Sequence, residues 1–434
     1  MERYSEYKDS GVQWLGEIPG HWNCVRIKAL FLNIREKNNP IQTEERLSLS
    51  IDKGVTLYSE KTTNLDRFKE DCSQYLLAHE DDIVLNSMNM IVGAVGKSKY
   101  FGCVSPAYYV IRLRDTSNYI DYYSQLLNIQ KIRDVYRIMG KGIMAIDRGD
   151  GKVNTCRLKV PYDSFGSIKI PLPPLSEQHS IVSYLDDKCG KIDKMLEGKQ
   201  KQIELLAEMK QRIIADAVTH GLNPDVKMKA TKILWLPEIP EHWEMDSLRR
   251  FLRIFTEKGH GDKQLLSVTR EQGVIERNTD STEDNHNFIP EDLSGYKYVQ
   301  VGDFVINKMK SWQGSYGVSE YEGIVSPAYF TCKLQGVDKH FFSTAIRSKI
   351  YVSFFARYSK GIRVDQWDLS PVALKSIPFA LPPLPEQRAI VLYITEKTAK
   401  IDTLTSKLQQ EIESIKEYKQ RLISDVVTGQ IKVC

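Results

Sequence analysis

The sequence predicts an α+β fold in which two similar globular domains are separated by two long helices. The chain has 434 residues, which is too long for one ordinary core. One segment recurs 209 positions further along the chain. Short β-rich runs lie between turn residues before each copy of it. These observations divide the chain into a first globular domain at 1–171, a first helix at 172–222, a second globular domain at 223–380 and a second helix at 381–434.

The repeat is tight in the predicted helices and loose in the globular domains. Residues 172–221 and 381–430 are identical at 24 of 50 positions without a gap, and they begin Leu172-Pro-Pro-Leu-Ser-Glu-Gln and Leu381-Pro-Pro-Leu-Pro-Glu-Gln. The domains match only in short islands 221 positions apart, such as 14–22 with 235–243 and 104–108 with 325–329. The two halves therefore keep one element and vary the other.

Each tight copy has the apolar period of a long helix, and each predicted helix covers about 43 residues, or roughly 60 Å. The expected apolar stripes are Ile181, Leu185, Ile192, Met195, Ile203, Leu206, Ile213 and Ala217 in the first copy, and Ile390, Ile394, Ile401, Leu404, Leu408, Ile412, Ile415, Leu422 and Val426 in the second. Neither helix can bury such a stripe alone, so we expect the two to pair.

Local signals mark where the helices start and stop. Ser176 is expected to cap the first helix, and Pro385 fits the first turn of the second, where its missing donor costs nothing. Gly221 and Gly429 are expected to close the two ends. Gly198 stands inside the first helix and is expected to soften it, at roughly 1 kcal/mol relative to alanine.

The direction of pairing is open from topology, because some 160 residues connect the two helices. A duplication around a pseudo-twofold axis would make them an antiparallel intrachain coiled coil, which is the arrangement we favour. The alternative is two helices docked on separate domains. Within the domains, strands are expected at 82–85, 108–113, 303–306 and 328–334, and helical stretches near 119–139 and 339–358.

Composition is that of a globular protein, with 41% hydrophobic and 27% charged residues. Residues 1–6 have no apolar stretch behind their charges, so we expect no signal peptide and a cytoplasmic location. The seven cysteines contain no Cys-x-x-Cys pair and the eight histidines no metal-ligand spacing. We therefore expect reduced thiols and no metal.

The net charge of +4 is unevenly distributed. Residues 176–218 contain 8 acidic and 7 basic side chains, and residues 385–427 contain 7 of each, so the helices sum to −1 and the remainder carries +5. An anionic partner is therefore expected on the globular domains rather than on the helices.

Motifs for catalysis are missing from the sequence. Gly93-Ala-Val-Gly96-Lys97-Ser98 resembles a phosphate loop, but Ile91 stands where that loop needs its first glycine, and the second copy lacks the lysine. The segment is better read as a strand–turn–strand. An adenine methyltransferase loop and a nucleophile elbow are also missing, and no nuclease carboxylate pattern stands in both copies. The sequence thus favours a non-catalytic protein without a bound cofactor.

Polar and basic side chains in glycine-containing loops are the candidates for DNA contact, because lysine and arginine hold phosphates or read guanine and asparagine and glutamine read adenine. They are Asn86, Lys97, Lys99, Lys141 and Arg148 in the first domain, and Asn307, Lys308, Lys310, Gln313, Lys360, Arg363 and Gln366 in the second. The Trp-and-His frames at 14–22 and 235–243 could stack bases, but their shared form favours a scaffolding role.

The duplicated motif resembles the specificity subunits of type I restriction-modification enzymes. It is carried by Leu172-Pro-Pro-Leu-x-Glu-Gln with Lys191-Ile-Asp193, by Leu381-Pro-Pro-Leu-x-Glu-Gln with Lys400-Ile-Asp402, and by the ending Val427-Thr-Gly429. The resemblance implies two target recognition domains, each reading one half of a bipartite DNA site, held apart by antiparallel spacer helices.

The same resemblance implies that two modification subunits dock on the chain and bring S-adenosylmethionine and adenine methylation. Restriction subunits would bring ATP, Mg and translocation. Docking is expected near Glu177, Gln178, Glu386 and Gln387, whose alternative role is to complement the helix dipole. Two other functions stay open at this point: a single-chain DNA-modifying enzyme, and a coiled-coil adaptor that organises proteins.

Overall fold

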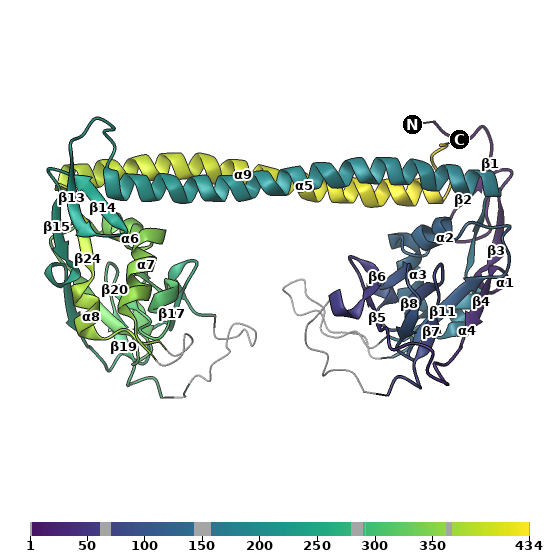
Figure 1. Ribbon diagram of the computed structural model, residues 1–434, viewed down its shortest axis with the longest axis horizontal. Coiled ribbons are helices and arrows are strands. Elements are labelled where there is room, and N and C mark those ends of the chain that lie inside the picture. Colours follow the sequence, from purple (N-terminus) through teal and green to yellow (C-terminus); the bar gives the residue numbers. More distant parts are fainter. Residues whose placement is uncertain are drawn as a thin grey trace. The chain divides into compact units, whose positions relative to one another are not determined.

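The computed structural model describes residues 2–60, 71–142, 158–278, 290, 292–361 and 367–433. It divides into two compact units (Figure 1). Unit 1 contains Met1–Lys199 and Gln410–Cys434, and unit 2 contains Gln200–Gln409. Each unit thus combines one mixed helix-and-strand domain with a segment of both long helices, which confirms the predicted fold class. Within the described residues, no helix is both long and apolar enough to cross a membrane.

Unit 1 is built on a four-stranded antiparallel sheet in the order β4-β11-β8-β9. Its strands are β4 (Phe31–Ile34), β11 (Tyr108–Leu113), β8 (Ile83–Asn86) and β9 (Val95–Lys97). Two-stranded pairs surround it: β1 (Tyr7–Asp9) with β2 (Glu17–Pro19), β3 (Asn23–Arg26) with β12 (Lys169–Leu172), β5 (Leu47–Ser50) with β6 (Gly54–Leu57), and β7 (Leu76–Ala78) with β10 (Gly102–Val104). The helices are α1 (Ile27–Leu30), α2 (Ile120–Leu126), α3 (Gln130–Met139) and α4 (Tyr162–Ser167).

Unit 2 repeats this topology, with a sheet in the order β16-β23-β20-β21. Its strands are β16 (Leu252–Phe255), β23 (Phe330–Leu334), β20 (Phe304–Ile306) and β21 (Tyr316–Val318). The flanking pairs are β13 (Met228–Ile233) with β14 (Leu236–Pro240), β15 (Glu244–Ser247) with β24 (Pro378–Leu381), β17 (Leu266–Thr269) with β18 (Gly273–Glu276), and β19 (Lys297–Val299) with β22 (Gly323–Val325). The helices are α6 (Lys339–Ile346), α7 (Lys349–Tyr358) and α8 (Pro371–Ser376).

The four predicted strands are present within one or two residues of their expected bounds. Each predicted helical stretch is instead two helices, α2 and α3 in unit 1 and α6 and α7 in unit 2. The breaks occur because Ile129 and Ser348 adopt extended backbone, with ψ of 153° at both. Gly93, with φ of 103°, turns the chain into β9, as the strand–turn–strand reading predicted.

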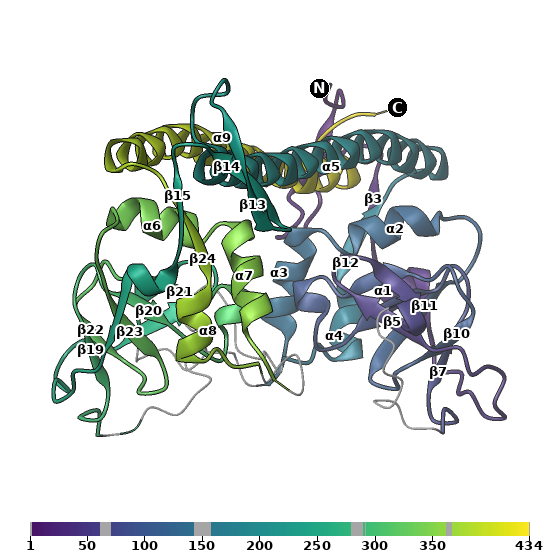
Figure 2. The ribbon, with the colours of Figure 1, turned by 60° about the vertical axis from the view of Figure 1, so that its left-hand side comes forward.

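The long helices are α5 (Leu175–His220) and α9 (Leu384–Val427), and they lie side by side (Figures 1 and 2). Within unit 1, Lys419 pairs with Asp193 at 2.5 Å and Lys199 pairs with Glu411. Asp193 comes before Lys199 in α5, whereas its partner Lys419 comes after Glu411 in α9, so the two helices run antiparallel. Within unit 2, Lys210 pairs with Asp402 at 2.7 Å. Asp193 and Asp402 occupy equivalent positions of the two tight copies, and so do Lys210 and Lys419.

The apolar stripe joins the helices to the domain cores. In unit 1, Ile181 and Leu185 of α5 and Leu422 and Val426 of α9 belong to one core with Trp22. In unit 2, the matching core contains Ala217, Ile390, Ile394 and Trp243. Figure 2 shows α2 of unit 1 lying between the sheet and α5.

Two details of the helix prediction are wrong. Met195 and Leu404, at equivalent positions, are 54% and 46% exposed, because the buried stripe of α9 passes directly from Ile401 to Leu408. Ser176 is not the cap of α5, since it is the second residue of the helix and the carbonyl of Pro174 accepts the first backbone bonds. α5 continues through Gly198 without interruption, and the softening expected there stays a prediction.

The ends of the helices follow the prediction. Gly221 and Gly429 have φ of 75° and 74°, the left-handed backbone that closes a helix. A side chain at Gly429 would also collide with Pro19 and Trp22, which lie 2.6 and 2.9 Å from the position of its Cβ. Glycine is therefore required there for close packing as well as for backbone conformation.

A carboxylate at the start of α5 fastens the domain of unit 1 to the helix. Glu177 accepts hydrogen bonds from the Tyr4 hydroxyl and Trp22 Nε1, both at 2.9 Å, and lies 2.5 Å from His21 Nε2. Burial alone would raise the pKa of Glu177, but the hydrogen bonds from Trp22, His21 and Tyr4 outweigh it and hold that pKa below its usual value. We call this set of four residues the helix lock of unit 1.

The neighbouring glutamines are internal as well. Gln178 is fully buried, accepts from the Tyr119 backbone at 2.7 Å and donates to the Pro173 carbonyl at 2.9 Å. Gln387, in the same place in unit 2, accepts from Asp338 and donates to Pro382, both at 2.8 Å. Each glutamine thus ties the start of a long helix to a loop of its own domain.

The helix lock of unit 2 has fewer bonds. Glu386 contacts His242 Nε2 at 2.7 Å. Trp243 is as buried as Trp22, but within the described residues its Nε1 has no hydrogen-bond acceptor. Burial of both tryptophans confirms the scaffolding role predicted for them.

We expect Ile390→Ala to destabilise the protein by about 2–5 kcal/mol, because the removed atoms lie in the fully buried core of unit 2. Leu392→Ala, on the same helix but 71% exposed, is the matched control and should cost less than about 0.5 kcal/mol. Urea unfolding followed by circular dichroism compares the two. Equal losses would contradict the burial assigned to Ile390.

The two locks predict unequal effects of the same substitution. Trp22→Phe removes a donor from the part-buried Glu177, whereas Trp243→Phe removes an indole N–H without an acceptor. Both leave a similar cavity, so Trp22→Phe should cost about 1–3 kcal/mol more. Urea midpoints of the two variants measure the difference, and a larger loss for Trp243→Phe would contradict the assignment.

The stabilising contribution of Glu177 should depend on pH. A carboxylate whose pKa is depressed by folding stabilises fully above its unfolded pKa of about 4.3, and this contribution falls as the pH drops through the folded pKa. The stability difference between the wild type and Glu177→Gln should therefore be constant near pH 7 and shrink below about pH 4. Unfolding free energies across this range test it; a difference that grows in acid would show the opposite shift.

Candidate nucleic-acid interface

Unit 1 carries an open groove of about 1010 Å³ lined by basic and aromatic side chains, which we call the basic groove. Four of its lining residues are basic and one is acidic, and three tyrosines lie among them. These basic residues and tyrosines are Arg35, Lys37, Tyr108, Tyr109, Lys141, Lys159 and Tyr162. Such a mixture of positive charge, apolar rings and amide groups suits the phosphates, sugars and base edges of a nucleic acid.

The sheet of unit 1 positions the groove. Asn33, Arg35 and Lys37 line it from β4 and the residues after it, at alternate positions that face the same way in an extended chain. Tyr108 begins the neighbouring strand, β11. Across the groove, Lys141 and Lys159 exchange two backbone hydrogen bonds of 2.9 Å, which holds their side chains next to each other.

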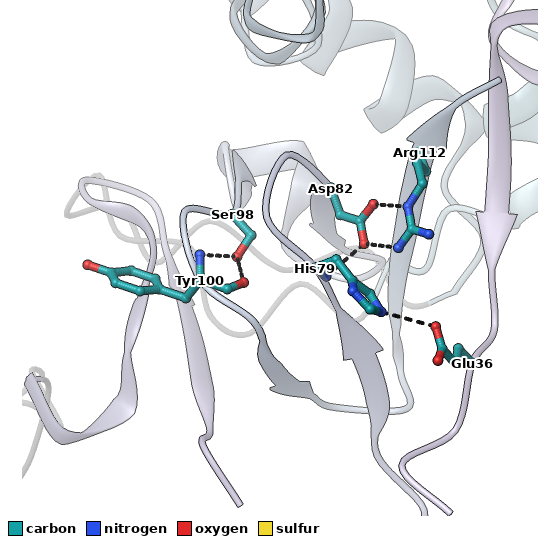
Figure 3. A network of polar contacts seen from close by, with 6 residues as sticks. All are labelled: Glu36, His79, Asp82, Ser98, Tyr100 and Arg112. Carbon is teal, nitrogen blue, oxygen red and sulfur yellow. Dashed lines mark hydrogen bonds and ion pairs between the residues drawn. The ribbon is translucent and has the colours of Figure 1, made fainter. Parts of the chain in front are cut away.

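A polar network anchored on one buried carboxylate reaches the residue between Arg35 and Lys37 (Figure 3). Asp82 is fully buried and accepts from Arg112 Nε and Nη2 at 2.6 and 2.8 Å. It also accepts from the backbone of His79 at 2.8 Å, and the ring of His79 reaches Glu36 at 3.2 Å. Because Glu36 lies between Arg35 and Lys37, this chain of bonds holds the segment that carries both.

An asparagine hydrogen-bonds Tyr108 in unit 1 and Tyr329 in unit 2, which we call the central tyrosines. Asn86 is 8% exposed and hydrogen-bonds Tyr108, while burial raises the pKa of that tyrosine. Asn307 is 6% exposed and donates to the hydroxyl of Tyr329 at 3.3 Å. Both asparagines, predicted as DNA contacts, lie behind the surface and act on the tyrosines.

The corresponding surface of unit 2 is also basic. Lys297 donates to the carbonyl of Tyr329 at 2.6 Å, and burial lowers the pKa of Lys297, with the nearby charges of Lys258 and Lys308 acting in the same direction. Lys308 pairs with Asp368 at 3.1 Å, and Asp368 exchanges backbone bonds with Lys360. Lys297 therefore contacts the tyrosine of unit 2, and Lys258 and Lys308 lie close to Lys297.

The structure places the other predicted DNA contacts in different settings. Lys97 is engaged by Asp81 at 3.0 Å and Asp121 at 2.6 Å. Lys99, Lys141, Lys310 and Lys360 are exposed, and Gln313 is half-buried in the short helix 311–313. Arg148, Arg363 and Gln366 lie outside the described residues. Contact with DNA stays a prediction for all twelve residues.

The basic groove includes residues that the sequence reasoning missed, namely Arg35, Lys37 and Lys159, with Lys258 and Lys297 on the corresponding surface. One signal was present. The repeated Val-Ser-Pro-Ala-Tyr at 104–108 and 325–329 ends in the two central tyrosines. The strands that bring Arg35 and Lys37 beside Tyr108 are distant in sequence, and this pairing was not predicted.

Of the four predicted docking residues, Glu177 and Glu386 lie in the helix locks, and Gln178 and Gln387 directly follow them in the chain. Gln178 and Gln387 are buried, whereas the carboxylate side chains of Glu177 and Glu386 are 14% and 26% exposed. Partner docking there stays a prediction, in which only the glutamates present part of their surface.

Comparison with known proteins connects both halves of the chain to one family. Residues 19–205 match the model of the type I restriction modification DNA specificity domain. The chain is 26% identical to the type I restriction enzyme MjaVIII specificity subunit of Methanocaldococcus jannaschii, over 100% of this chain and 98% of that one. It is 25% identical to the putative type I restriction enzyme MjaX specificity subunit of the same organism, over 96% of each chain.

A solved structure has the same fold. It comes from work on the complex assembly and conformational transition of the type I R-M system, and it aligns with a TM-score of 0.63 over 95% of this chain and 99% of its own. Because the sequence identity is 13%, this alignment shows similarity of fold only. Together with the sequence matches, it leads to one conclusion: the chain is similar over its whole length to type I restriction-modification specificity subunits.

Proposed function

We propose that the chain is the non-catalytic DNA-specificity subunit of a type I restriction-modification complex. The observation that carries the proposal is the basic surface around a tyrosine at the same topological place in both units, with Tyr108 in one and Tyr329 in the other. Two such surfaces on one chain suit a DNA site with two halves. Phosphate contacts from their lysines would supply affinity, and side chains facing the base edges would supply specificity.

In this proposal, residues 1–171 and 223–380 are the target recognition domains and 172–222 and 381–434 are the spacer helices. The cross-pairs Lys419–Asp193 and Lys210–Asp402 support a fixed helix register, which would set the distance between the half-sites. Exposed pairs of this kind contribute little energy, about 0–1 kcal/mol each, so they would serve alignment more than stability.

The chemistry would reside in partners. Two modification subunits would bring S-adenosylmethionine and methylate adenine, and restriction subunits would bring ATP and Mg. The chain would dock them from the helices and adjoining faces, with Glu177 and Glu386 as the positions to test first. Cys24, Cys189 and Cys332, in the described part of the chain, are free thiols and suit a reducing cytoplasm, where the chain would meet chromosomal DNA.

The similarity to specificity subunits and the two basic surfaces favour this function over a single-chain enzyme or a coiled-coil adaptor. An adaptor would have no reason to keep a basic surface beside a supported tyrosine in both units. Binding of S-adenosylmethionine by the purified chain alone would support the single-chain enzyme instead.

Lengthening both helices tests the spacer role. Seven residues inserted at matched places in α5 and α9 keep the apolar register and add about 10 Å, which is about three base pairs of duplex. Methylome sequencing of cells carrying the variant and its methyltransferase partners should show the same two half-sites with a gap about three base pairs longer.

An insertion in α5 alone is the control, because it shifts the stripe of one helix against the other and should abolish methylation. A changed half-site in the double insertion, or an unchanged gap, would contradict the spacer role. Cells in which the wild-type gene directs no split adenine motif would contradict the proposed function as a whole.

A further inference from the structure

The strand ladders give a residue-by-residue equivalence between the basic groove and its counterpart in unit 2. Phe31 pairs with Leu113 on β11, and Leu252 pairs with Leu334 on β23, so Phe31 and Leu252 are equivalent. Counting forward along each chain, Arg35 corresponds to Thr256 and Lys37 to Lys258. The two surfaces can therefore be compared position by position within one protein.

Three groove positions are the same in both units. Lys37 and Lys258 are exposed after equivalent strands, and Lys141 and Lys360 are exposed on equivalent backbone bridges. Tyr108 and Tyr329 are half-buried and are held by equivalent asparagines. The positions shared by the two units are therefore two exposed lysines and one tyrosine that is held by an asparagine.

Other positions differ in charge or shape. Arg35 is exposed in unit 1, and the exposed Thr256 stands in its place. Leu76, opposite Val104, corresponds to Lys297, opposite Val325. Lys159 corresponds to Asp368, because each bridges to the shared lysine. These differences lie among the shared residues rather than on another face.

Arg35 lines the groove together with Tyr109 and Tyr162. Burial raises the pKa of both tyrosines, and the charge of Arg35 opposes this rise. The backbone carbonyl of the adjacent Glu36 accepts a hydrogen bond of 2.8 Å from the backbone of Leu77, which fixes the chain beside Arg35. An arginine at this place can present two parallel donors, as recognition of guanine O6 and N7 requires.

The backbone of duplex DNA is alike at every half-site, while the base edges differ. Phosphate contacts carry no sequence information, so a chain that reads two half-sites can keep them in both readers and must change its base contacts. We propose, on the basis of the proposed function, that Lys37/Lys258 and Lys141/Lys360 hold phosphates in both half-sites and that Arg35 reads a guanine in the half-site of unit 1. Thr256, in the same place, would present its methyl group to a different base.

The test uses the complex of the full chain with its methyltransferase partners. Dissociation constants are measured for the site found by methylome sequencing and for two duplexes, each with one half-site scrambled, at several salt concentrations. Arg35→Thr should lower the preference for the first half-site about 5- to 150-fold and leave the preference for the second within twofold. Arg35→Lys should behave in the same way, because a lysine cannot form the two parallel bonds.

Lys37→Ala is the contrasting variant. It should weaken all three duplexes by the same factor, keep both preferences and reduce the slope of log affinity against log salt by about 1. Lys8→Ala removes an exposed charge on β1, outside the groove, and should leave every constant unchanged. All the substituted side chains are exposed, so circular dichroism melting curves should match that of the wild type.

The inference is overturned if Arg35→Thr weakens all duplexes equally, or if Arg35→Lys restores wild-type binding, because either result makes Arg35 a phosphate contact. It is also overturned if Lys37→Ala changes the preference for one half-site. A wild-type complex without preference for any bipartite duplex would instead refute the proposed function.

Discussion

Neither long helix can bury its apolar stripe by itself, and the architecture of both units follows from this constraint. Each stripe is covered along its length by the other helix and at each end by a domain core. In unit 1 the core that contains Trp22 takes up Ile181 from α5 and Val426 from α9. The domain, one end of α5 and one end of α9 are therefore a single hydrophobic body, and the polar bonds of Glu177 and Gln178 orient its parts.

Duplication explains which features are kept. The helices must match each other, so Asp193 and Asp402 meet Lys419 and Lys210 from the opposite copy. The helix locks keep the carboxylate, the histidine and the tryptophan, although only Trp22 has a partner for its indole N–H among the described residues. The groove keeps Asn86 and Asn307 with the tyrosines that they hold, and it varies exposed positions such as Arg35 and Thr256. Structural contacts thus differ less between the two units than these exposed positions do.

The sequence allowed the helices to be predicted well, because their period, their end glycines and their near-identical copies all depend on local pattern. The errors had physical causes: Met195 and Leu404 are apolar but lie off the stripe, and the break at Ile129 depends on its extended backbone. The candidate site was harder to predict. Arg35 and Tyr108 become neighbours only through the pairing of β4 with β11, which a single sequence does not specify. Gln178 was assigned to docking because its burial comes from contacts with residues some 60 positions away.

The uneven division of the chain between the units has a consequence for synthesis. Unit 2 is one continuous segment, Gln200–Gln409, whereas unit 1 needs both Met1–Lys199 and Gln410–Cys434. During translation, unit 2 can complete its core while the ribosome is still at work, but the first domain made must wait for the last helix turns to emerge. Until then, the surface around Trp22 that later covers Leu422 and Val426 stays open to water. A stop codon in the final twenty-five codons would therefore damage the part of the protein that was made first.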